Sequence, residues 1–188
     1  MTNDQVLNLF RESGALLEGH FKLSSGLHST GYLQCALVLQ DPTRAQQLGA
    51  ALGALLKAYN ANVVLSPALG GLIIGHEVAR ALGVRAIFVE RVDKTLTLRR
   101  GFTLSSSDRV VVIEDVVTTG LSTRETIDAA KAHGATIVAA GSIIDRSGKQ
   151  DLGVPYHALS TLVLPTYQPD ACPLCASGSP VTKPGSRT

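Results

Sequence analysis

The sequence predicts an α/β fold built on an open, mainly parallel central sheet that is flanked by helices. Short runs of β-branched residues alternate along the chain with segments of helical periodicity, as in repeated strand–helix–strand units. Gly83 and Gly134 directly follow two of the helical segments, where glycine can end a helix. The chain has 188 residues, 45% of them hydrophobic, which suits one domain with a sizeable core.

The first 40 residues predict a helix followed by a hairpin. Apolar residues recur at near-helical spacing between about Gln5 and Leu17, and Gly19 follows as a stop signal. The segment Phe21 to Gln34 predicts a short hairpin around Ser24-Ser25-Gly26. We therefore expect residues 1–40 to form a separate N-terminal part of the fold.

Residues 41–165 predict the repeating core. Asp41-Pro42 starts a helix that runs to about Asn60, because proline suits the first helical position. The elements expected after it are a strand Val63 to Ser66, a helix Leu72 to Leu82, a strand Arg85 to Glu90, a polar loop, a strand Val110 to Ile113, a helix Leu121 to His133, a strand Thr136 to Ile144 and a strand around His157 to Leu164. Such alternation predicts right-handed crossovers between parallel strands. Residues 166–188 are rich in Pro, Gly, Ser and Thr, and we expect a tail that completes one compact domain.

Composition and charge exclude several classes of function. Lys and Arg total 17 against 15 acids, which is too even a balance for a nucleic-acid or membrane surface. Aromatic residues are 4% of the chain and Trp is absent, so the stacking residues of an RNA-binding sheet are missing. The N-terminus lacks the pattern of a signal peptide, and no apolar run reaches membrane-spanning length. Three cysteines, an odd number, favour a reducing compartment, and we expect a cytoplasmic protein.

The most informative stretch is VVVIEDVVTTGLST, from Val110 to Thr123. Four β-branched residues predict a central strand buried on both faces. Glu114 and Asp115 follow at its carboxyl end, where ligands bind in open α/β sheets. Carboxylates accept hydrogen bonds from sugar hydroxyls and stabilise nearby cationic character. The alternative is that the two acids only end a strand.

The next residues predict a phosphate site at the start of a helix. Thr118 to Ser122 offer consecutive backbone N–H groups and three hydroxyls at a helix N-terminus, where unpaired donors and the helix dipole favour an anion. Ser122 and Glu125 also have the spacing of a capping box, so Ser122 can cap the helix and bind at once. The two acids and the predicted phosphate loop together indicate a site for ribose 5-phosphate.

This stretch resembles the phosphoribosyl-pyrophosphate signature of the type I phosphoribosyltransferases. That signature is an apolar strand, two acids, two apolar residues and a Thr/Gly turn. The resemblance covers about residues 15–165 and implies the fold of that family, with the N-terminal hairpin as a small hood. It also implies a set of residues that bind phosphoribosyl pyrophosphate: Ala68, Leu69, Gly70, Gly71, Arg91, Lys94, Glu114, Asp115, Val116, Val117, Thr118, Thr119, Gly120, Leu121 and Ser122.

The loop SPALGG, Ser66 to Gly71, predicts a second anion site. It joins a strand to a helix, and Gly70 and Gly71 permit close approach of diphosphate oxygens to the backbone. The alternative is an ordinary turn with glycine for packing. The resemblance implies that this loop holds the pyrophosphate, often with a cis peptide bond, for which Ala68-Leu69 is the candidate.

The segment Glu90 to Gly101 carries four cations, Arg91, Lys94, Arg99 and Arg100. A mobile loop can bring Lys or Arg to a leaving diphosphate and exclude water, although a solvated hairpin is the alternative. The resemblance implies a homodimer in which the loop 91–100 reaches the partner subunit's site, with catalytic roles for Arg91 and Lys94 beside Glu114 and Asp115. The sequence departs from the family pattern at Val92, where lysine is frequent, and has no histidine in this loop.

Asp145-Arg146 follows a predicted strand, which places Arg146 at the same edge of the sheet as the acids. A guanidinium can bind a planar carboxylate through two hydrogen bonds. In the orotate-using branch of the family, residues matched by Arg146 and Thr118 contact the base. Tyr32 and Leu33 match hood positions, whereas Ser24 stands where lysine is frequent. Packing within the hairpin explains Tyr32 equally well.

Two motifs remain outside this interpretation. Cys172 and Cys175 form half of a zinc-ribbon pattern, with no second CxxC and no suitably spaced histidine pair. A reduced structural pair is favoured, and a four-sulfur site shared across a dimer is the alternative. The histidines are scattered along the sequence, so none is assigned to catalysis and no residue to a protein-held metal: His20, His28, His76, His133 and His157.

The resemblance implies a Mg²⁺-dependent enzyme that transfers ribose 5-phosphate from phosphoribosyl pyrophosphate to orotate. Mg²⁺ is expected to bridge substrate oxygens and water rather than occupy a cage of protein ligands. Two alternatives stay open. One is a purine phosphoribosyltransferase on the same scaffold, and the other is a noncatalytic regulator that senses phosphoribosyl pyrophosphate.

Overall fold

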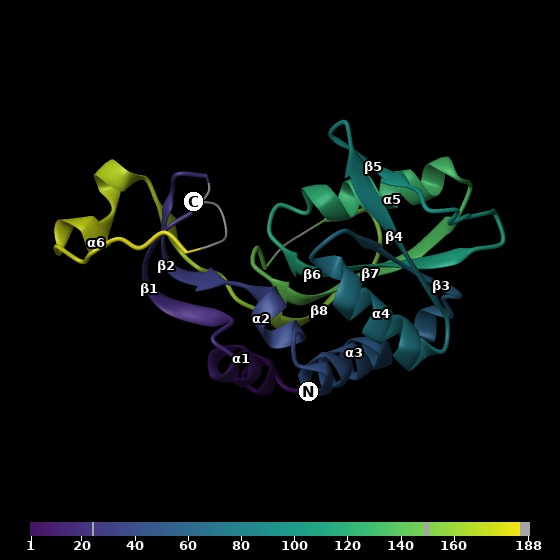
Figure 1. Cartoon of the computed structure of the whole chain (residues 1–188), viewed down its shortest axis with the longest axis horizontal. Helices are drawn as coiled ribbons and strands as arrows, with labels where there is room; N and C mark the ends of the chain where they lie inside the picture. Colours follow the sequence, from purple (N-terminus) through teal and green to yellow (C-terminus); the bar gives the residue numbers. More distant parts are fainter. Residues whose placement is uncertain (24, 149–150, 185–188) are drawn as a thin grey trace.

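The computed structural model of the protein describes residues 1–23, 25–148 and 151–184. Within these residues six strands form a central sheet in the order β5-β4-β3-β6-β7-β8 (Figure 1). Its neighbours are parallel except at the β4–β5 edge, so the predicted α/β class is confirmed. The strands of this sheet are β3 (Val63–Pro67), β4 (Arg85–Val92), β5 (Thr95–Leu98), β6 (Arg109–Val117), β7 (Thr136–Asp145) and β8 (Tyr156–Thr161).

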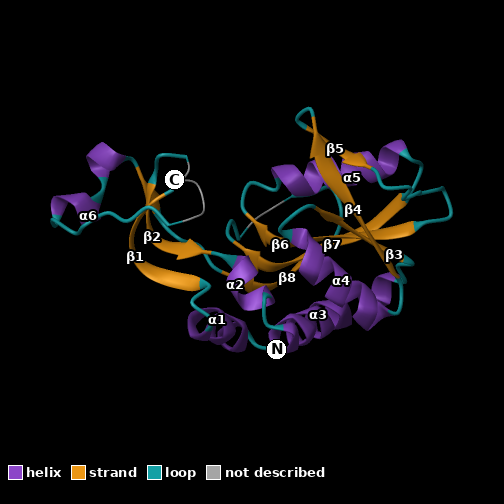
Figure 2. Ribbon diagram, viewed as in Figure 1, coloured by secondary structure: helices purple, strands orange, loops and turns teal. Residues whose placement is uncertain are grey.

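Helices cover both faces of this sheet (Figure 2). On one face lie α1 (Asn3–Glu12), α3 (Pro42–Leu56) and α4 (Gly71–Leu82), which pack in one cluster with Val64 and Val111. On the other face α5 (Leu121–Ala132) packs in a second cluster with Val63 and Val110. Neighbouring residues of each strand therefore face opposite layers. This explains why the centre of β6 is apolar at every position, as the sequence predicts.

Strand β6 is longer than predicted and includes the acid pair. Its pairing with β3 ends at Leu65 and Val112, whereas its pairing with β7 continues to Val117 and Asp145. Glu114 and Asp115 therefore lie within β6 but beyond the end of the β3 ladder. The extra pairing with β7 holds the backbone of both acids in an extended form at the carboxyl end of the sheet.

Two further elements also differ in extent from the prediction. The first helix ends at Glu12 rather than near Leu17, because Gly14 adopts a left-handed φ of 68° and the chain turns there. The predicted polar loop after β4 contains the edge strand β5, joined to β4 by a tight turn at Asp93 and Lys94. Both turn residues have positive φ, as two-residue hairpin turns require.

A second, three-stranded sheet stands apart from the central sheet, at the left of Figure 1. It has the order β1-β2-β9, with β1 (Leu16–Lys22), β2 (His28–Leu33) and β9 (Thr166–Tyr167). The predicted hairpin is thus confirmed, but its first arm begins at Leu16 and it gains a strand from the C-terminal segment. Ser24 of its turn lies outside the described residues.

The remaining elements are short. They are α2 (Cys35–Leu39), the 3₁₀ helices η1 (Lys57–Tyr59) and η2 (Pro169–Ala171), and α6 (Pro173–Ala176). In the part of the chain that the structure describes, no helix combines the length and the apolar character needed to cross a membrane.

Candidate active site

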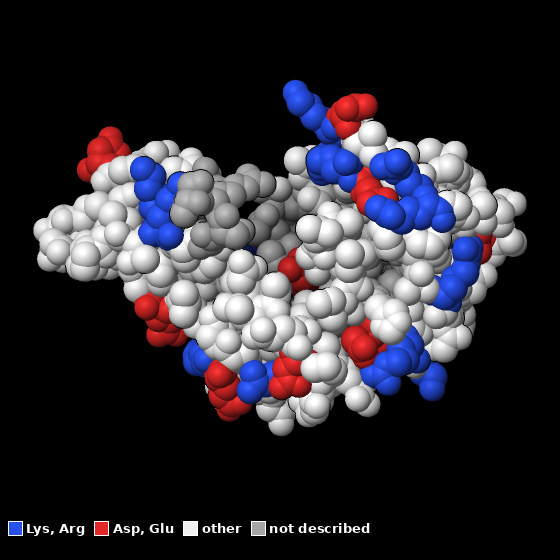
Figure 3. All heavy atoms as spheres, in the orientation of Figure 1, with Lys and Arg blue, Asp and Glu red and all other residues white. Residues whose placement is uncertain are grey.

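Three loops converge at the carboxyl end of the central sheet. They follow β3, β6 and β7, which are neighbours in the sheet, so residues far apart in sequence come together. A hollow of about 290 Å³ lies there, and Figure 3 shows acidic atoms exposed in the depression between the two sheets. The hollow is lined by Pro67, Ala68, Gly70, Arg91, Leu96, Glu114, Asp115, Val116 and Ser122.

The loop after β3 lies directly against the acid pair. A Cβ atom on Gly70 would stand 2.8 Å from Oδ1 of Asp115, closer than real Cβ contacts allow. Any larger residue at this position would displace the side chain of Asp115. The Ala68-Leu69 peptide bond is cis, as the sequence resemblance implied. The side chain of Leu69 is 82% exposed, so the loop presents its backbone rather than a packed side chain.

The two acids have different environments. Glu114 is buried, and burial followed by the neighbouring Asp115 raises its pKa to about 9. At neutral pH Glu114 is therefore protonated. Asp115 is the more exposed of the two acids. The Oδ1 atom of Asp115 accepts a hydrogen bond of 2.8 Å from the backbone N–H of Val116, which fixes its carboxylate. The pair can donate one proton and also face a cation.

The loop after β6 forms a smaller hollow of about 50 Å³ that adjoins the first. Gly120 is the N-cap of α5 with a left-handed φ of 72°, and no side chain caps this helix. The capping box expected at Ser122 is therefore wrong, because Ser122 lies inside the first turn and Glu125 bonds to Arg91 instead. The Oγ1 atom of Thr119 accepts 3.4 Å from the N–H of Leu121. The N–H groups that follow lie at a helix N-terminus, where an anion can bind.

Arg146 lies beside the phosphate loop. Its backbone N–H donates 2.8 Å to the carbonyl of Val117, so Arg146 and Thr118 are neighbours across β6 and β7. The guanidinium is half-buried, and burial lowers its pKa. Among the described residues, its Nε atom has no hydrogen-bond partner although it is buried. A buried unpaired donor is costly, and a bound acceptor would satisfy it.

Two cations of the β4–β5 hairpin, Arg91 and Lys94, lie in different surroundings. Arg91 lines the hollow of about 290 Å³ that contains the acid pair. It donates a hydrogen bond to the carboxylate of Glu125, and this bond raises the pKa of Arg91. Lys94 stands exposed at the turn and lines another hollow, between the hairpin and α5. The structure thus brings Arg91, but not Lys94, to the acid pair of its own chain. Figure 3 shows Lys and Arg gathered over this hairpin.

Sequence reasoning missed two residues next to the acids. The thiol of Cys35 is buried, and its pKa is raised by burial and then by Asp115. Tyr156 donates or accepts a 2.6 Å hydrogen bond with Ser142, which pairs with Glu114 across the sheet, and burial raises the pKa of Tyr156. No local motif marks either residue, because each reaches the site only through tertiary packing.

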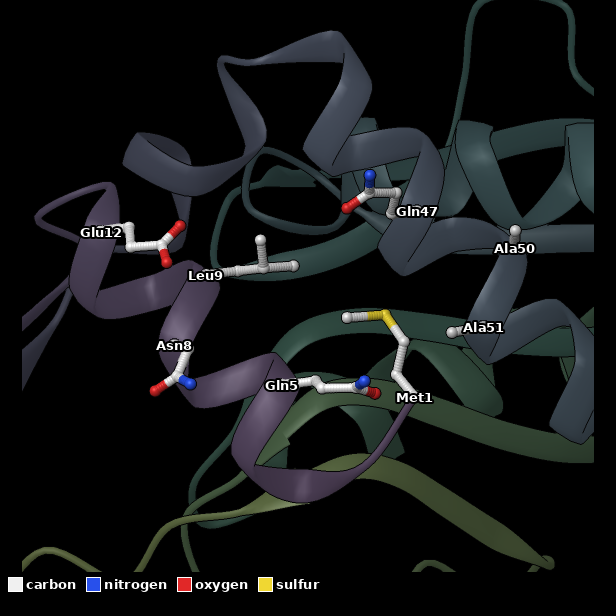
Figure 4. Close-up of a pocket in the computed structure, with 8 residues that line it drawn as sticks. All are labelled: Met1, Gln5, Asn8, Leu9, Glu12, Gln47, Ala50 and Ala51. Atoms are coloured by element: carbon white, nitrogen blue, oxygen red, sulfur yellow. The ribbon is translucent and has the colours of Figure 1, made fainter.

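A larger hollow, about 670 Å³, lies between α1 and α3. Figure 4 shows Met1, Gln5 and Leu9 opposite Gln47 and Ala51 in this groove. It contains none of the anion-binding loops and only one ionisable side chain, Glu12, among the residues that line it. Size alone therefore does not make it the reaction site, and the smaller polar hollows at the sheet edge fit a phosphorylated substrate better.

Comparison with known proteins places the chain in a known class of enzymes. A family model described as "Phosphoribosyl transferase domain" matches residues 38–154, so the chain belongs to the phosphoribosyltransferase family. Within that family it belongs with the orotate phosphoribosyltransferases. It is 54% identical to the one from Carboxydothermus hydrogenoformans, with 97% of each chain covered, and 55% identical to the one from Erythrobacter litoralis, with 100% and 99% covered.

Solved structures show the same fold. The orotate phosphoribosyltransferase of Aeropyrum pernix aligns with a TM-score of 0.71 and 27% identity, over 84% of this chain and 93% of that chain. An adenine phosphoribosyltransferase from Thermoanaerobacter pseudethanolicus aligns with a TM-score of 0.61 and 16% identity, over 70% and 88%. The fold is thus common to enzymes that are named for different bases. The choice of base must therefore come from particular residues.

Proposed function

We propose that the protein transfers ribose 5-phosphate from phosphoribosyl pyrophosphate to orotate, giving orotidine 5′-monophosphate and pyrophosphate in pyrimidine biosynthesis. The observation that carries this proposal is the meeting of two anion-binding loops around one acid pair. Residues 68–71 and 118–122 contribute to adjoining hollows that share Glu114, Val116 and Ser122. A sugar with a phosphate at one end and a diphosphate at the other fits that arrangement.

The small hollow suits the 5′-phosphate. It is lined by Glu114 and residues 116–123, and it lies at the start of α5. Backbone N–H groups at a helix N-terminus bind a phosphate with both hydrogen bonds and the helix dipole. Thr118, Thr119 and Ser122 line the same space, and their hydroxyls can donate to the remaining phosphate oxygens.

The acid pair suits the ribose and the transition state. When the bond to pyrophosphate breaks, positive charge develops on the anomeric carbon and the ring oxygen. The Asp115 carboxylate stabilises that charge, because it is fixed by the Val116 N–H before the reaction begins. Protonated Glu114 can donate a hydrogen bond to a ribose hydroxyl, whereas Asp115 accepts one.

The loop at Ala68 to Gly71 suits the diphosphate. Ala68 and Gly70 line the hollow of about 290 Å³ that contains the acid pair, and Arg91 lines the same hollow. Mg²⁺ supplies charge neutralisation on the diphosphate when it is bound. The residues fit such an ion, because the carboxylate oxygens of Asp115 stand beside the diphosphate loop, and Mg²⁺ takes few protein ligands. Gly70 keeps this loop close enough to the acids for substrate oxygens to span them.

Arg146 and Thr118 suit the base. Orotate carries a carboxylate on a planar ring, and a guanidinium can bind it through two hydrogen bonds. The unpaired Nε atom of Arg146 is the donor that such a carboxylate would satisfy. An uncharged purine offers no such partner, so the arginine favours orotate.

Lys94 and the rest of the loop 91–100 act across a homodimer in this proposal. Lys94 is exposed at the hairpin turn and does not reach the acids of its own chain. A cation at the tip of an exposed hairpin can instead enter the site of a second subunit and balance the charge of the leaving diphosphate.

The test is pyrophosphate release from phosphoribosyl pyrophosphate with four separate bases. We expect turnover with orotate, and turnover with adenine, guanine or xanthine lower by at least about 1000-fold, since a buried charged donor would lose its partner. Preference for a purine would assign the chain to the other branch of the family. Binding of phosphoribosyl pyrophosphate without turnover of any base would indicate a regulator.

A further inference from the structure

The hairpin β1–β2 and the C-terminal segment bring together four side chains that the proposed reaction does not use. His20 and His28 come from the hairpin, Cys172 directly precedes α6, and Cys175 lies within α6. One ligand atom from each residue lies within 4.8 Å of all the others. Figure 1 shows the hairpin and the yellow C-terminal segment side by side, away from the central sheet.

The distances among these atoms resemble those of a tetrahedral zinc centre. Nε2 of His20 lies 2.9 Å from Nδ1 of His28, 3.5 Å from Sγ of Cys172 and 3.7 Å from Sγ of Cys175. Sγ of Cys175 lies 3.3 Å from Nδ1 of His28. Zinc bonds of about 2.3 Å to sulfur and about 2.0 Å to nitrogen require separations of about 3.3–3.8 Å at tetrahedral angles. The three nitrogen–sulfur separations fall within that range, and the nitrogen–nitrogen separation is shorter.

A bulge in β1 aims His20 at this cluster. Phe21 pairs with Ser29, whereas Glu18 pairs with Gly31, so β1 has one residue more than β2 over this stretch. The extra residue changes the side of the sheet to which the following side chains point. His20 and His28 are both buried as a result, with ring centres 4.8 Å apart.

His20 is also oriented as metal-binding histidines usually are. Its Nδ1 atom lies 2.9 Å from the backbone carbonyl of Ser179, so Nδ1 carries the proton and donates it there. That tautomer leaves the lone pair of Nε2 directed at His28 and the two sulfur atoms. A second hydrogen bond of this kind fixes the ring and strengthens the ligand in known metal sites.

The C-terminal segment needs such a link, because it has almost no apolar core. Among the described residues from Pro165 to Pro184, Cys172 is the one that is buried. The segment is otherwise held by β9 and by backbone hydrogen bonds of Thr182 with His20 and Lys22. A small module without a hydrophobic core commonly depends on a disulfide or a metal, and both cysteines here are free thiols.

We infer that His20, His28, Cys172 and Cys175 bind one zinc ion within a single chain. Two thiolates and two neutral imidazoles form a closed four-ligand set, which is typical of structural rather than catalytic zinc. The ion fastens the C-terminal segment to the hairpin, and each cysteine releases its proton on binding. This replaces the sequence-based preference for a reduced cysteine pair, since the missing half of the motif comes from the two histidines.

Metal analysis of the purified full-length protein tests the inference. We expect about one zinc per chain, and a content at least tenfold lower in His28→Gln and in the double variant Cys172→Ser/Cys175→Ser. Cys35→Ala and His76→Gln are the matched controls, because they remove the same residue types outside the cluster, and both should retain zinc. Equal zinc in the cluster variants and the controls would overturn the inference.

A second measurement covers the case in which the cluster variants do not fold. Wild-type protein is stripped of metal with a chelator and titrated with Co²⁺. We expect the absorption of tetrahedral cobalt with a thiolate charge-transfer band, saturating at about one equivalent. Absence of that band, or a Cys172–Cys175 disulfide in freshly purified wild-type protein, would contradict the site. These readouts do not depend on turnover, so they stand apart from the proposed reaction.

Discussion

The two ends of the central sheet use polar residues in opposite ways. At the amino end, the side chain of Asn62 accepts 2.8 Å from the backbone N–H of Arg109 and donates 3.2 Å to the carbonyl of Ser107. Arg85 donates 2.9 Å to Asp108 at the same end. These polar groups bind other groups of the chain and hold the loops between strands and helices.

At the carboxyl end, two polar groups do not serve to hold other parts of the chain in this way. Glu114 has a pKa raised to about 9 by burial and by Asp115, and the buried Nε atom of Arg146 has no partner among the described residues. Polar groups without a hydrogen-bond partner, and neighbouring groups of like charge, lower the stability of a fold. Such groups are found at sites where a bound ligand satisfies them. We therefore expect changes at the carboxyl end to affect substrates, and equivalent changes at the amino end to affect stability.

The largest expected effect is that of Asp115→Asn at the carboxyl end. We expect kcat to fall by about 100–1000-fold, because the preorganised charge facing the sugar cation is lost. The amide oxygen can still accept from the Val116 N–H, so the melting temperature should stay close to that of the wild type. Steady-state release of pyrophosphate and thermal unfolding measure the two quantities.

Asp108→Asn is the matched control at the amino end. It makes the same chemical change but weakens bonds from Arg85 and Ser105, so we expect a loss of about 1 kcal/mol in unfolding free energy and unchanged kcat. A near-normal rate in Asp115→Asn would remove its assigned role and the contrast between the two ends.

Arg146→Ala tests base recognition. We expect kcat/KM for orotate to fall by about 10–150-fold, which corresponds to about 1.5–3 kcal/mol for a charge-assisted hydrogen bond. The KM for phosphoribosyl pyrophosphate should change little. Arg109→Ala is the control, because Arg109 donates hydrogen bonds to the carbonyls of Tyr59 and Asn60. This variant should lower the free energy of unfolding and leave kcat/KM for orotate unchanged. An unchanged kcat/KM for orotate in Arg146→Ala would refute the contact.

Two glycine substitutions sharpen the same contrast. In Gly70→Ala the new methyl group would meet Asp115, so we expect the KM for phosphoribosyl pyrophosphate to rise by about 5–100-fold with little loss of stability. In Gly49→Ala the methyl group would stand 2.4 Å from Cβ of Glu77 between α3 and α4. That variant should lose about 1–3 kcal/mol of stability and keep its KM. Equal effects of both on KM would contradict the assignment of the loop.

A pH dependence of stability is also expected from Glu114. Its pKa is about 4.5 in the unfolded chain and about 9 in the fold, so the proton stabilises the fold fully below about pH 4.5. This contribution is lost as the pH rises toward 9, by at most about 1.4 kcal/mol per pH unit. Relative to Glu114→Gln, the wild type should therefore lose about 1 kcal/mol or more between pH 6 and pH 8. A constant difference in denaturant unfolding would show that Glu114 is ionised.

The sequence could predict the parts that depend on local pattern. The β-branched run of β6 predicts a buried strand, and Gly70 and Gly71 predict a loop that allows close approach, without knowledge of tertiary contacts. It could not predict that β6 continues through Val117, because the added length comes from pairing with β7. The lost capping box has a similar origin, since Glu125 is drawn away from Ser122 to Arg91.

The histidine–cysteine cluster shows the limit of reading motifs along the chain. His20 and Cys172 are far apart in sequence, and the spacing between His20 and His28 fits no metal motif, so both pairs look incomplete. They meet only because a bulge turns His20 inward and because Thr182 and β9 bring the C-terminal segment to the hairpin. A bulge depends on register, which a single sequence specifies weakly.

The most direct test of the account is a crystal structure of the protein with phosphoribosyl pyrophosphate and Mg²⁺. We expect the 5′-phosphate on the backbone of residues 118–122, the diphosphate on residues 68–71, and ribose hydroxyls within hydrogen-bond reach of Glu114 and Asp115. Substrate bound in the groove between α1 and α3, or a phosphate loop closed to the ligand, would contradict the account.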